Sequence, residues 1–295
     1  SALNHMDLWV TRGKPQPPLP HVPGCDLTGT IAAIGADVDN VAVGDEVVVN
    51  PAVSPVADIV TLGNDSPMGR GFHILGEHAW GGHATAVNVP ARNVLPRPQQ
   101  RSWEECAAYP LAFLTAYRML RRARLRAGET VLVVGIGSGV STAALAIARQ
   151  FGADVVVTSR SEAKRAAALE LGASAAVDSD DARWNVQADV AIDSVGPATF
   201  DKTVRSLRSG GRLAVCGGTS GQEATINLPR LFFKQLEIIG STMGSYQEFA
   251  EVTALFAGGL PVAIDGPYDL ADYPAALARL DAGEQLGKVV LRHPG

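Results

Sequence analysis

A glycine-rich turn between an apolar run and a helix constrains the fold of this chain more than any other feature. Residues 130–134 form a short apolar run that predicts a buried strand, and residues 142–151 predict a helix rich in small residues. Gly135, Gly137 and Gly139 lie between them. Glycines let the backbone approach phosphate oxygens, and a helix N-terminus supplies N–H groups and the positive end of a dipole. The segment therefore predicts a phosphate-binding turn.

The turn departs from the strict GxGxxG spacing, because Val140 stands where the last glycine is expected. A tight strand-to-helix turn that binds no ligand is therefore the alternative. The order of strand, turn, helix and a second strand about 20 residues later is typical of dinucleotide sites. We therefore expect a dinucleotide whose pyrophosphate is held by Gly135, Gly137, Ser138, Gly139 and Val140.

From residue 103 onward, helical and strand-like patterns alternate. Residues 104–122 are apolar at helical intervals. Strands are then expected over residues 130–134, 154–157, 189–192, 213–215 and 237–239. Helices are expected over residues 142–151, 162–171 and 199–207, the last of which Gly210 and Gly211 would end. Such alternation predicts an α/β fold with a doubly wound parallel sheet. A final helix over 275–280 and a strand over 288–291 have no assigned place.

Residues 26–98 are richer in Val, Gly and Pro and carry only short apolar runs. Strands are expected over residues 27–34, 46–49 and 81–87, the last entered through a Gly-Gly turn. This part of the chain therefore predicts a second, β-rich domain with the form of a barrel.

The end of the second strand of the parallel sheet indicates which dinucleotide binds. A site selective for NADH places Asp or Glu there, to accept hydrogen bonds from the ribose hydroxyls. This chain has Ser159 and Arg160 instead, with Lys164 one helical turn later and no carboxylate before Glu162. Hydroxyl and cationic groups suit a 2′-phosphate and favour NADPH. The alternative is that both cations are ordinary solvated residues at a helix start.

Composition and charge exclude several classes of partner. The net charge of −5 and the absence of a basic cluster beyond a helix face do not suggest a nucleic-acid partner. No apolar stretch approaches the roughly 20 residues that span a bilayer, so no membrane partner is expected. The first residues lack a basic segment followed by an apolar run, so we expect no signal peptide. Three widely spaced cysteines are typical of a protein of the reducing cytoplasm.

Several segments together resemble the medium-chain dehydrogenase/reductase superfamily, in the order that the superfamily has them. Besides the glycine turn they are residues 2–8, 23–29, 43–47, 75–78, 114–117, 193–196 and 287–290. The resemblance implies a GroES-like catalytic domain over residues 1–112, to which residues 256–295 return, and a Rossmann domain over residues 113–255. It implies an active site in the cleft between the two. Members usually carry further residues before this start, so we expect the barrel to lack its usual first strands.

The superfamily has a zinc branch, which the segments around residues 50–51 and 76–82 resemble, but the ligands of that branch are absent. Asn4 and Leu111 stand where the resemblance implies catalytic cysteines, Cys25 where it implies a histidine, and Asp26 where it implies a glutamate. The positions of the four structural-zinc cysteines hold Pro55, Asp58, Thr61 and Gly69. Since structural zinc sites need several thiolate or imidazole ligands, we expect no bound metal.

Without a Lewis acid nothing stabilises the alkoxide that alcohol oxidation requires, whereas an electron-poor acceptor needs less help. The resemblance therefore implies a zinc-independent oxidoreductase that transfers hydride from NADPH to a small electrophile, either a quinone or an activated alkene or carbonyl compound. Asn4 would hydrogen-bond the substrate oxygen, and Thr115 would contact the nicotinamide. Tyr117 and His5 are candidate proton donors.

Further cofactor contacts are expected where strands end, because ligands of open α/β sheets bind outside the carboxyl ends of the strands. The residues concerned are Ser194, Val195, Gly217, Thr219, Ser241, Thr242 and Met243. Lys288 matches a late lysine that the superfamily places on the cofactor side. The predicted strand at residues 237–240 lies late in the sheet and would pair with its copy in a homodimer.

Two other functions stay open at this point. The chain could be a non-catalytic protein that binds or senses NADPH, since the metal ligands of the zinc branch are absent. It could also be a zinc-dependent alcohol dehydrogenase with rearranged ligands.

Overall fold

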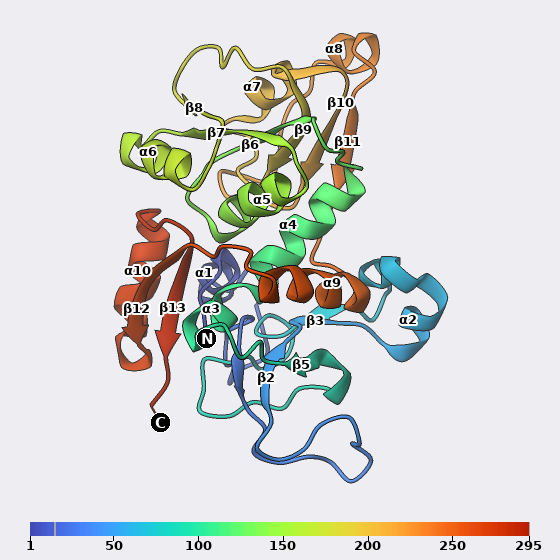
Figure 1. The fold of residues 1–295 in the computed structure, drawn as a ribbon, viewed down its shortest axis with the longest axis vertical. Coiled ribbons are helices and arrows are strands. Elements are labelled where there is room, and N and C mark those ends of the chain that lie inside the picture. Colours follow the sequence, from blue (N-terminus) through green and yellow to red (C-terminus); the bar gives the residue numbers. More distant parts are fainter. Residues whose placement is uncertain (15, 295) are drawn as a thin grey trace. The chain divides into compact units, whose positions relative to one another are not determined.

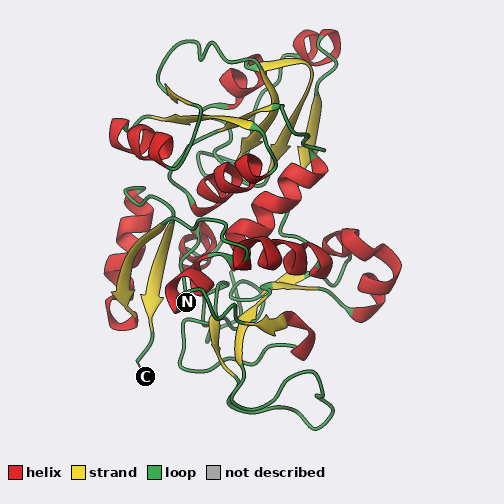
Figure 2. Ribbon diagram, viewed as in Figure 1, coloured by secondary structure: helices red, strands yellow, loops and turns green. Residues whose placement is uncertain are grey.

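The computed structural model describes residues 1–14 and 16–294, which form two compact units (Figure 1). The first comprises Ser1–Leu114 and Met243–Gly295, and the second comprises Thr115–Thr242. Both units contain helices and strands (Figure 2). Within the described residues, no helix has the length and apolar character needed to cross a membrane.

The second unit is built on one six-stranded sheet with the order β11-β10-β9-β6-β7-β8. All the strand pairs in this sheet are parallel. The strands are β6 (Thr130–Val133), β7 (Asp154–Ser159), β8 (Ala175–Asp178), β9 (Ala188–Asp193), β10 (Leu207–Val215) and β11 (Glu237–Gly240). The strand order reverses beside β6, which lies between β7 and β9, and such switch points bind ligands at their carboxyl ends. The predicted doubly wound parallel sheet is confirmed.

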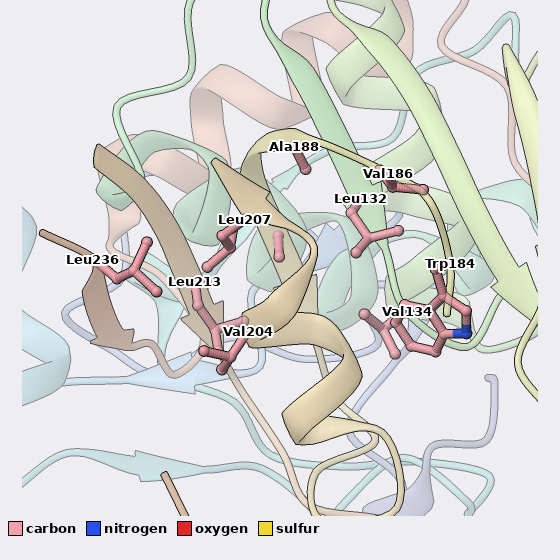
Figure 3. Packing of buried hydrophobic residues seen from close by; sticks show 10 residues of the cluster. Leu132, Val134, Trp184, Val186, Ala188, Val204, Leu207, Leu213 and Leu236 are labelled. Carbon is pink, nitrogen blue, oxygen red and sulfur yellow. The ribbon is translucent and has the colours of Figure 1, made fainter. Parts of the chain in front are cut away.

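Helices connect these strands and cover the sheet. They are α5 (Gly139–Gln150), α6 (Glu162–Glu170), α7 (Phe200–Arg205) and α8 (Leu228–Phe233). The crossover β6–α5–β7 moves along the sheet in one direction and β9–α7–β10 in the other. Because such crossovers are right-handed, α5 and α7 cover opposite faces. The apolar core of this unit includes Leu132, Val134, Trp184, Leu207 and Leu213, and Figure 3 shows their packing.

The first unit contains smaller sheets. Strands β1 (Thr28–Thr30), β2 (Glu46–Val49) and β5 (Val94–Pro96) form an antiparallel sheet in the order β1-β2-β5. Strands β3 (Ala52–Val53) and β4 (His73–Ile74) pair antiparallel, and β12 (Ile264–Asp269) and β13 (Lys288–Arg292) pair parallel. The helices of at least six residues that lie wholly in this unit are α1 (His5–Thr11), α2 (Val56–Leu62), η1 (Gly63–Met68), α3 (Trp103–Ala108), α9 (Tyr246–Ala257) and α10 (Tyr273–Ala282).

The start of the sequence packs against its last segment. The Leu3 N–H donates to the Val289 carbonyl at 2.8 Å, and Leu3 and Leu8 share a buried cluster with Leu280 and Leu291. This packing brings α1, α10 and β13 together around the first residues of the chain. The domain boundaries predicted from the sequence stay a prediction.

Three sequence predictions about elements of the fold were wrong in detail. Residues 81–87 form no strand, because the N–H groups of Gly81 and Gly82 donate to carbonyls of Val22 and Gly24 rather than to a strand ladder. The expected helix over 104–122 is two helices, α3 and α4 (Pro110–Arg122), because Pro110 has no N–H to donate to the carbonyl four residues before it.

The third wrong prediction concerns the Gly-Gly pair expected to end a helix. Helix α7 ends at Arg205, and Gly210 and Gly211 lie inside β10, where the register with β9 shifts between Leu207 and Arg212. Gly210 has φ +74°, a conformation that glycine adopts without strain and that suits such an irregularity.

Candidate functional site

The glycine turn joins β6 to α5 at the centre of the parallel sheet. Gly135 and Gly137 have φ of +73° and +143°, which side chains disfavour. A Cβ atom on Gly135 would lie 2.6 Å from Cγ2 of Val195. A side chain at Gly135 would therefore both strain the backbone and clash with Val195.

Ser141 explains how the turn keeps its form without the last glycine of the motif. Its Oγ accepts a hydrogen bond from the Gly137 N–H at 3.2 Å and donates to the Ser138 carbonyl at 2.9 Å. The Ser138 Oγ in turn accepts from the Ser141 N–H at 3.1 Å and caps α5. Ser141 is buried, so a side chain inside the turn stabilises it.

Thr158 on β7 fixes the other end of the turn. Its Oγ1 accepts from the Gly135 N–H at 3.1 Å, and its carbonyl accepts from the Ile136 N–H at 2.7 Å. The N–H groups of Gly139 and Val140 lie in the first turn of α5, where a helix offers them no acceptor. The turn therefore fits a pyrophosphate, with these two N–H groups as donors.

The loops after β9 and β10 lie side by side. The Thr219 N–H donates to the Ser194 carbonyl at 3.2 Å, and the Asp193 Oδ1 accepts from the N–H groups of Val195 at 2.7 Å and Gly196 at 3.1 Å. Burial raises the pKa of Asp193, although these two N–H donors oppose the shift. The Val195 side chain also approaches Gly135, so the loop after β9 contacts the glycine turn.

The residue that follows β7 is a cation, Arg160. Arg160 is exposed and makes no hydrogen bond or ion pair within residues 1–14 and 16–294. Ser159 is buried, and its Oγ accepts from the Ser161 N–H at 3.1 Å. Lys164 lies in the first turn of α6, whose N-cap is Ser161. The structure thus keeps the predicted Ser159 and Arg160 at the carboxyl end of β7.

A buried polar network links three residues of the first unit. The Lys288 ammonium donates to the Asp26 Oδ2 at 2.6 Å, to the Asn4 Oδ1 at 2.6 Å and to the Leu3 carbonyl at 2.7 Å. The Asn4 Nδ2 donates to the Asp26 Oδ2 at 2.9 Å. Lys288 is 2 % exposed and Asp26 0 % exposed, so this is a buried ion pair that also holds the Asn4 amide.

This network includes most of the positions at which the zinc branch carries metal ligands. Asp26 also accepts from the Leu111 N–H at 2.6 Å, so Asn4, Asp26 and Leu111 meet as the resemblance implies. The Cys25 thiol lies 3.8 Å from the Met6 sulfur, and burial raises its pKa well above the usual range. A neutral thiol, an amide and a carboxylate already paired with an ammonium do not suit zinc. The described residues contain no group of three or more His, Cys, Asp or Glu side chains arranged to hold a metal.

The other predicted catalytic residues have different surroundings. His5 is half-buried at the start of α1, and burial, with the charge of Lys288, lowers its pKa. Thr115 and Tyr117 are buried on α4. The Tyr117 hydroxyl accepts from the Arg121 Nη1 at 3.1 Å, and its ring packs edge-on against Phe151.

The last predicted cofactor residues follow strands of the parallel sheet. Gly217 comes two residues after the end of β10. Ser241, Thr242 and Met243 come directly after β11, where the Ser241 N–H donates to the Val215 carbonyl at 2.9 Å. Sequence reasoning identified Asp26 only as the residue at a glutamate position and did not find its ion pair with Lys288. It also did not find Asp178, which forms an ion pair with Arg165. A buried carboxylate needs a cation or several donors, but no spacing in the sequence identifies the partner.

Comparisons with known proteins agree with this geometry. Residues 139–258 match the family model of the zinc-binding dehydrogenases, and residues 1–99 match that of the alcohol dehydrogenase GroES-like domain. The chain is 30 % identical to a 2-methylene-furan-3-one reductase from Solanum lycopersicum, over 100 % of this chain and 70 % of the relative. The chain belongs to the medium-chain dehydrogenase/reductase superfamily. Its fold is a GroES-like domain with a Rossmann domain, and it is an oxidoreductase.

Solved structures of this superfamily share the fold over almost the whole chain. An NAD-dependent alcohol dehydrogenase has a TM-score of 0.94 and 37 % identity, covering 99 % of this chain and 89 % of its own. The 2-octenoyl-CoA carboxylase reductase CinF, in complex with NADP and 2-octenoyl-CoA, has a TM-score of 0.88 and 27 % identity. The superposition with CinF covers 99 % of this chain and 76 % of the CinF chain. The superfamily therefore includes similar proteins that use different nicotinamide cofactors.

Proposed function

We propose that this superfamily member is an NADPH-dependent reductase that transfers hydride to a quinone or to an activated alkene or carbonyl compound without zinc. The observation that carries the proposal is the Lys288 ammonium, which lies between Asn4 and Asp26. The Lys288 ammonium neutralises the Asp26 carboxylate, which a metal site at this position would need as a ligand. Within residues 1–14 and 16–294, no ligand set is arranged for the Lewis acid that alcohol oxidation requires.

The residues at the end of β7 support NADPH as the cofactor. Arg160 is exposed and offers a guanidinium to a 2′-phosphate, which arginine binds well. The NADP in CinF supports the same cofactor, whereas the similar alcohol dehydrogenase is described as NAD-dependent. When bound, NADPH supplies the hydride, and the protein orients the reacting groups.

Asn4 is the proposed contact to the substrate oxygen. Its Oδ1 accepts from Lys288, and one of its two Nδ2 hydrogens goes to Asp26. One N–H is therefore left to donate to a carbonyl or quinone oxygen, where it would stabilise developing negative charge. The ion pair fixes the amide in the orientation that presents this hydrogen.

The proton that completes the reduction has two candidate donors among the predicted residues. His5 adjoins Asn4, and its lowered pKa makes it neutral at pH 7, when a ring N–H can still donate. The Tyr117 hydroxyl accepts from Arg121, which does not prevent it from donating its own hydrogen. We favour His5 because it adjoins Asn4 in the chain. Thr115 remains the proposed contact to the nicotinamide.

A turnover panel tests the proposed function. NADPH and NADH oxidation would be followed with quinones, enones and 2-enoyl-CoA thioesters, and alcohol oxidation with NADP⁺, before and after treatment with a zinc chelator. We expect NADPH-dependent reduction that the chelator leaves unchanged. Alcohol oxidation that disappears on zinc removal would instead assign a zinc dehydrogenase. Tight NADPH binding without turnover of any acceptor would assign a binding or sensing protein.

We also propose a homodimer in a reducing compartment. Strand β11 is an edge of the parallel sheet and exposes Ile238, so a second copy could extend the sheet there. Cys25, Cys106 and Cys216 are all free thiols, as in cytoplasmic proteins. Light scattering of the wild type and of Ile238→Lys tests the dimer, because a lysine on the edge opposes strand pairing.

A further inference from the structure

An arginine of α6 connects the end of β7 to the end of β8. The Arg165 Nη1 donates to the Ser159 carbonyl at 2.6 Å and forms an ion pair with the Asp178 Oδ2 at 2.9 Å. The two side chains are 20 % and 34 % exposed. Arg165 therefore contacts both β7, which ends at Ser159, and β8, the next strand of the sheet.

Asp178 lies where a carboxylate affects the choice of dinucleotide. In the parallel register of β7 and β8 it is the partner of Ser159, and neighbouring strands lie about 4.8 Å apart. A carboxylate beside the ribose accepts hydrogen bonds from the hydroxyls of NADH and repels the 2′-phosphate of NADPH. This acidic residue comes from the neighbouring strand, so the sequence around Ser159 does not reveal it.

The structure neutralises this carboxylate. The Asp178 Oδ1 accepts from the Asp180 N–H at 2.9 Å, and the Oδ2 is paired with Arg165. Both oxygens thus have partners within the protein. Arg160, by contrast, has no partner in the described chain and keeps its charge available. Arg165 thus neutralises the Asp178 carboxylate, and Arg160 offers a positive charge to the 2′-phosphate.

We propose that Arg165 is a specificity-determining residue that favours NADPH over NADH by holding Asp178 in an ion pair. It acts through Asp178 and is a positioning residue, because its guanidinium is occupied by Asp178 and the Ser159 carbonyl. The inference rests on the proposed binding of NADPH. Without Arg165, the Asp178 carboxylate is left free beside the ribose site and the preference shifts toward NADH.

Binding of 2′,5′-ADP and of 5′-AMP, measured by calorimetry, tests this inference without turnover. We expect Arg165→Gln to weaken 2′,5′-ADP binding by about fivefold and to leave 5′-AMP binding unchanged or stronger, as loss of one partly exposed charge pair allows. Arg165→Gln/Asp178→Asn should recover most of the lost affinity. NADPH and NADH titrations of the same variants should show the same change in ratio.

A matched control separates this effect from a general loss of an ion pair. Arg205 forms an exposed pair with Asp201 on α7 at 2.6 Å, and Arg205→Gln should change neither ligand's affinity. Equal weakening of both ligands in Arg165→Gln, or failure of Asp178→Asn to restore binding, would overturn the inference. If the wild type itself shows no preference for 2′,5′-ADP, the proposed cofactor is wrong. If the wild type prefers it and Arg165→Gln keeps that preference, only the role of Arg165 is wrong.

Discussion

The two units build their polar sites by different means. Around the glycine turn of the second unit, the donors are backbone N–H groups held by Thr158 and Ser141. In the first unit, the site is organised by full charges, the buried pair of Lys288 and Asp26. A backbone site needs unusual φ angles, whereas a charged site needs every charge to keep its partner. The two should therefore fail differently when single residues are changed.

The largest effect is expected on the charged side. Lys288→Met leaves the Asp26 carboxylate buried without its cation, which typically costs about 3–5 kcal/mol of unfolding free energy. Urea denaturation measures this loss. Lys288→Met/Asp26→Asn should recover part of it, because the second change removes the unpaired charge. A loss below about 1 kcal/mol in the single variant would mean that water reaches Asp26, contrary to its burial.

The backbone side is tested by Gly135→Ala. The residue has φ +73°, so a side chain costs about 1–2 kcal/mol of stability, and its Cβ would also meet Val195. Gly128→Ala is the matched control, since φ is +80° and no atom lies within 4 Å of the added Cβ. We expect both variants to lose stability but only Gly135→Ala to lose affinity for NADPH in a fluorescence titration. Equal affinity in the two variants would argue against phosphate binding at this turn.

Asp193 is a mixed case, a buried carboxylate whose Oδ1 accepts from two backbone N–H groups and whose Oδ2 has no partner in the described chain. Asp193→Ala should cost about 1–3 kcal/mol, because two N–H groups lose their acceptor. Asp193→Asn keeps an acceptor oxygen and should cost less.

The pH dependence of these variants follows from the raised pKa of Asp193. Because the folded protein binds this proton more readily than the unfolded chain, the charged carboxylate lowers stability at neutral pH. That penalty disappears as the pH falls through the raised pKa toward the ordinary value of 3.8. The stability of the wild type relative to Asp193→Asn should therefore rise on acidification. A difference that stays constant with pH would contradict the shift.

The smallest effect is expected at the exposed charge. Arg160→Gln should weaken NADPH binding by about tenfold, or about 1.4 kcal/mol, and leave stability and NADH binding unchanged. The loss should shrink in high salt, since exposed charges are screened. An equal loss for NADH would show that Arg160 contacts another part of the dinucleotide.

The features that could be predicted from the sequence are those that depend on contacts between residues close together in the chain. The turn at Gly135–Gly139 follows from local strand, glycine and helix signals, and the parallel sheet follows from the alternation of strands and helices. The Asn4–Lys288 contact joins residues 284 positions apart, and Asp178 reaches Ser159 only through strand register. Residues 81–87 have the glycines and apolar residues of a strand, but their hydrogen bonds go to the loop at Val22–Gly24. The pattern of residues within one segment does not show which distant segment it contacts.

Thr158 fixes how far the glycine turn lies from the residues at the end of β7. It holds the glycine turn through Gly135 and Ile136, and it is followed by Ser159, the last residue of β7, and then by Arg160. In the proposed cofactor site, β7, which pairs with both β6 and β8, therefore joins the glycine turn to the residues proposed to meet the ribose. Strand β7 therefore fixes the distance between the glycine turn and Arg160. We expect weak binding of a ligand whose phosphate and ribose are spaced differently from those of a dinucleotide, because it cannot contact both groups at once.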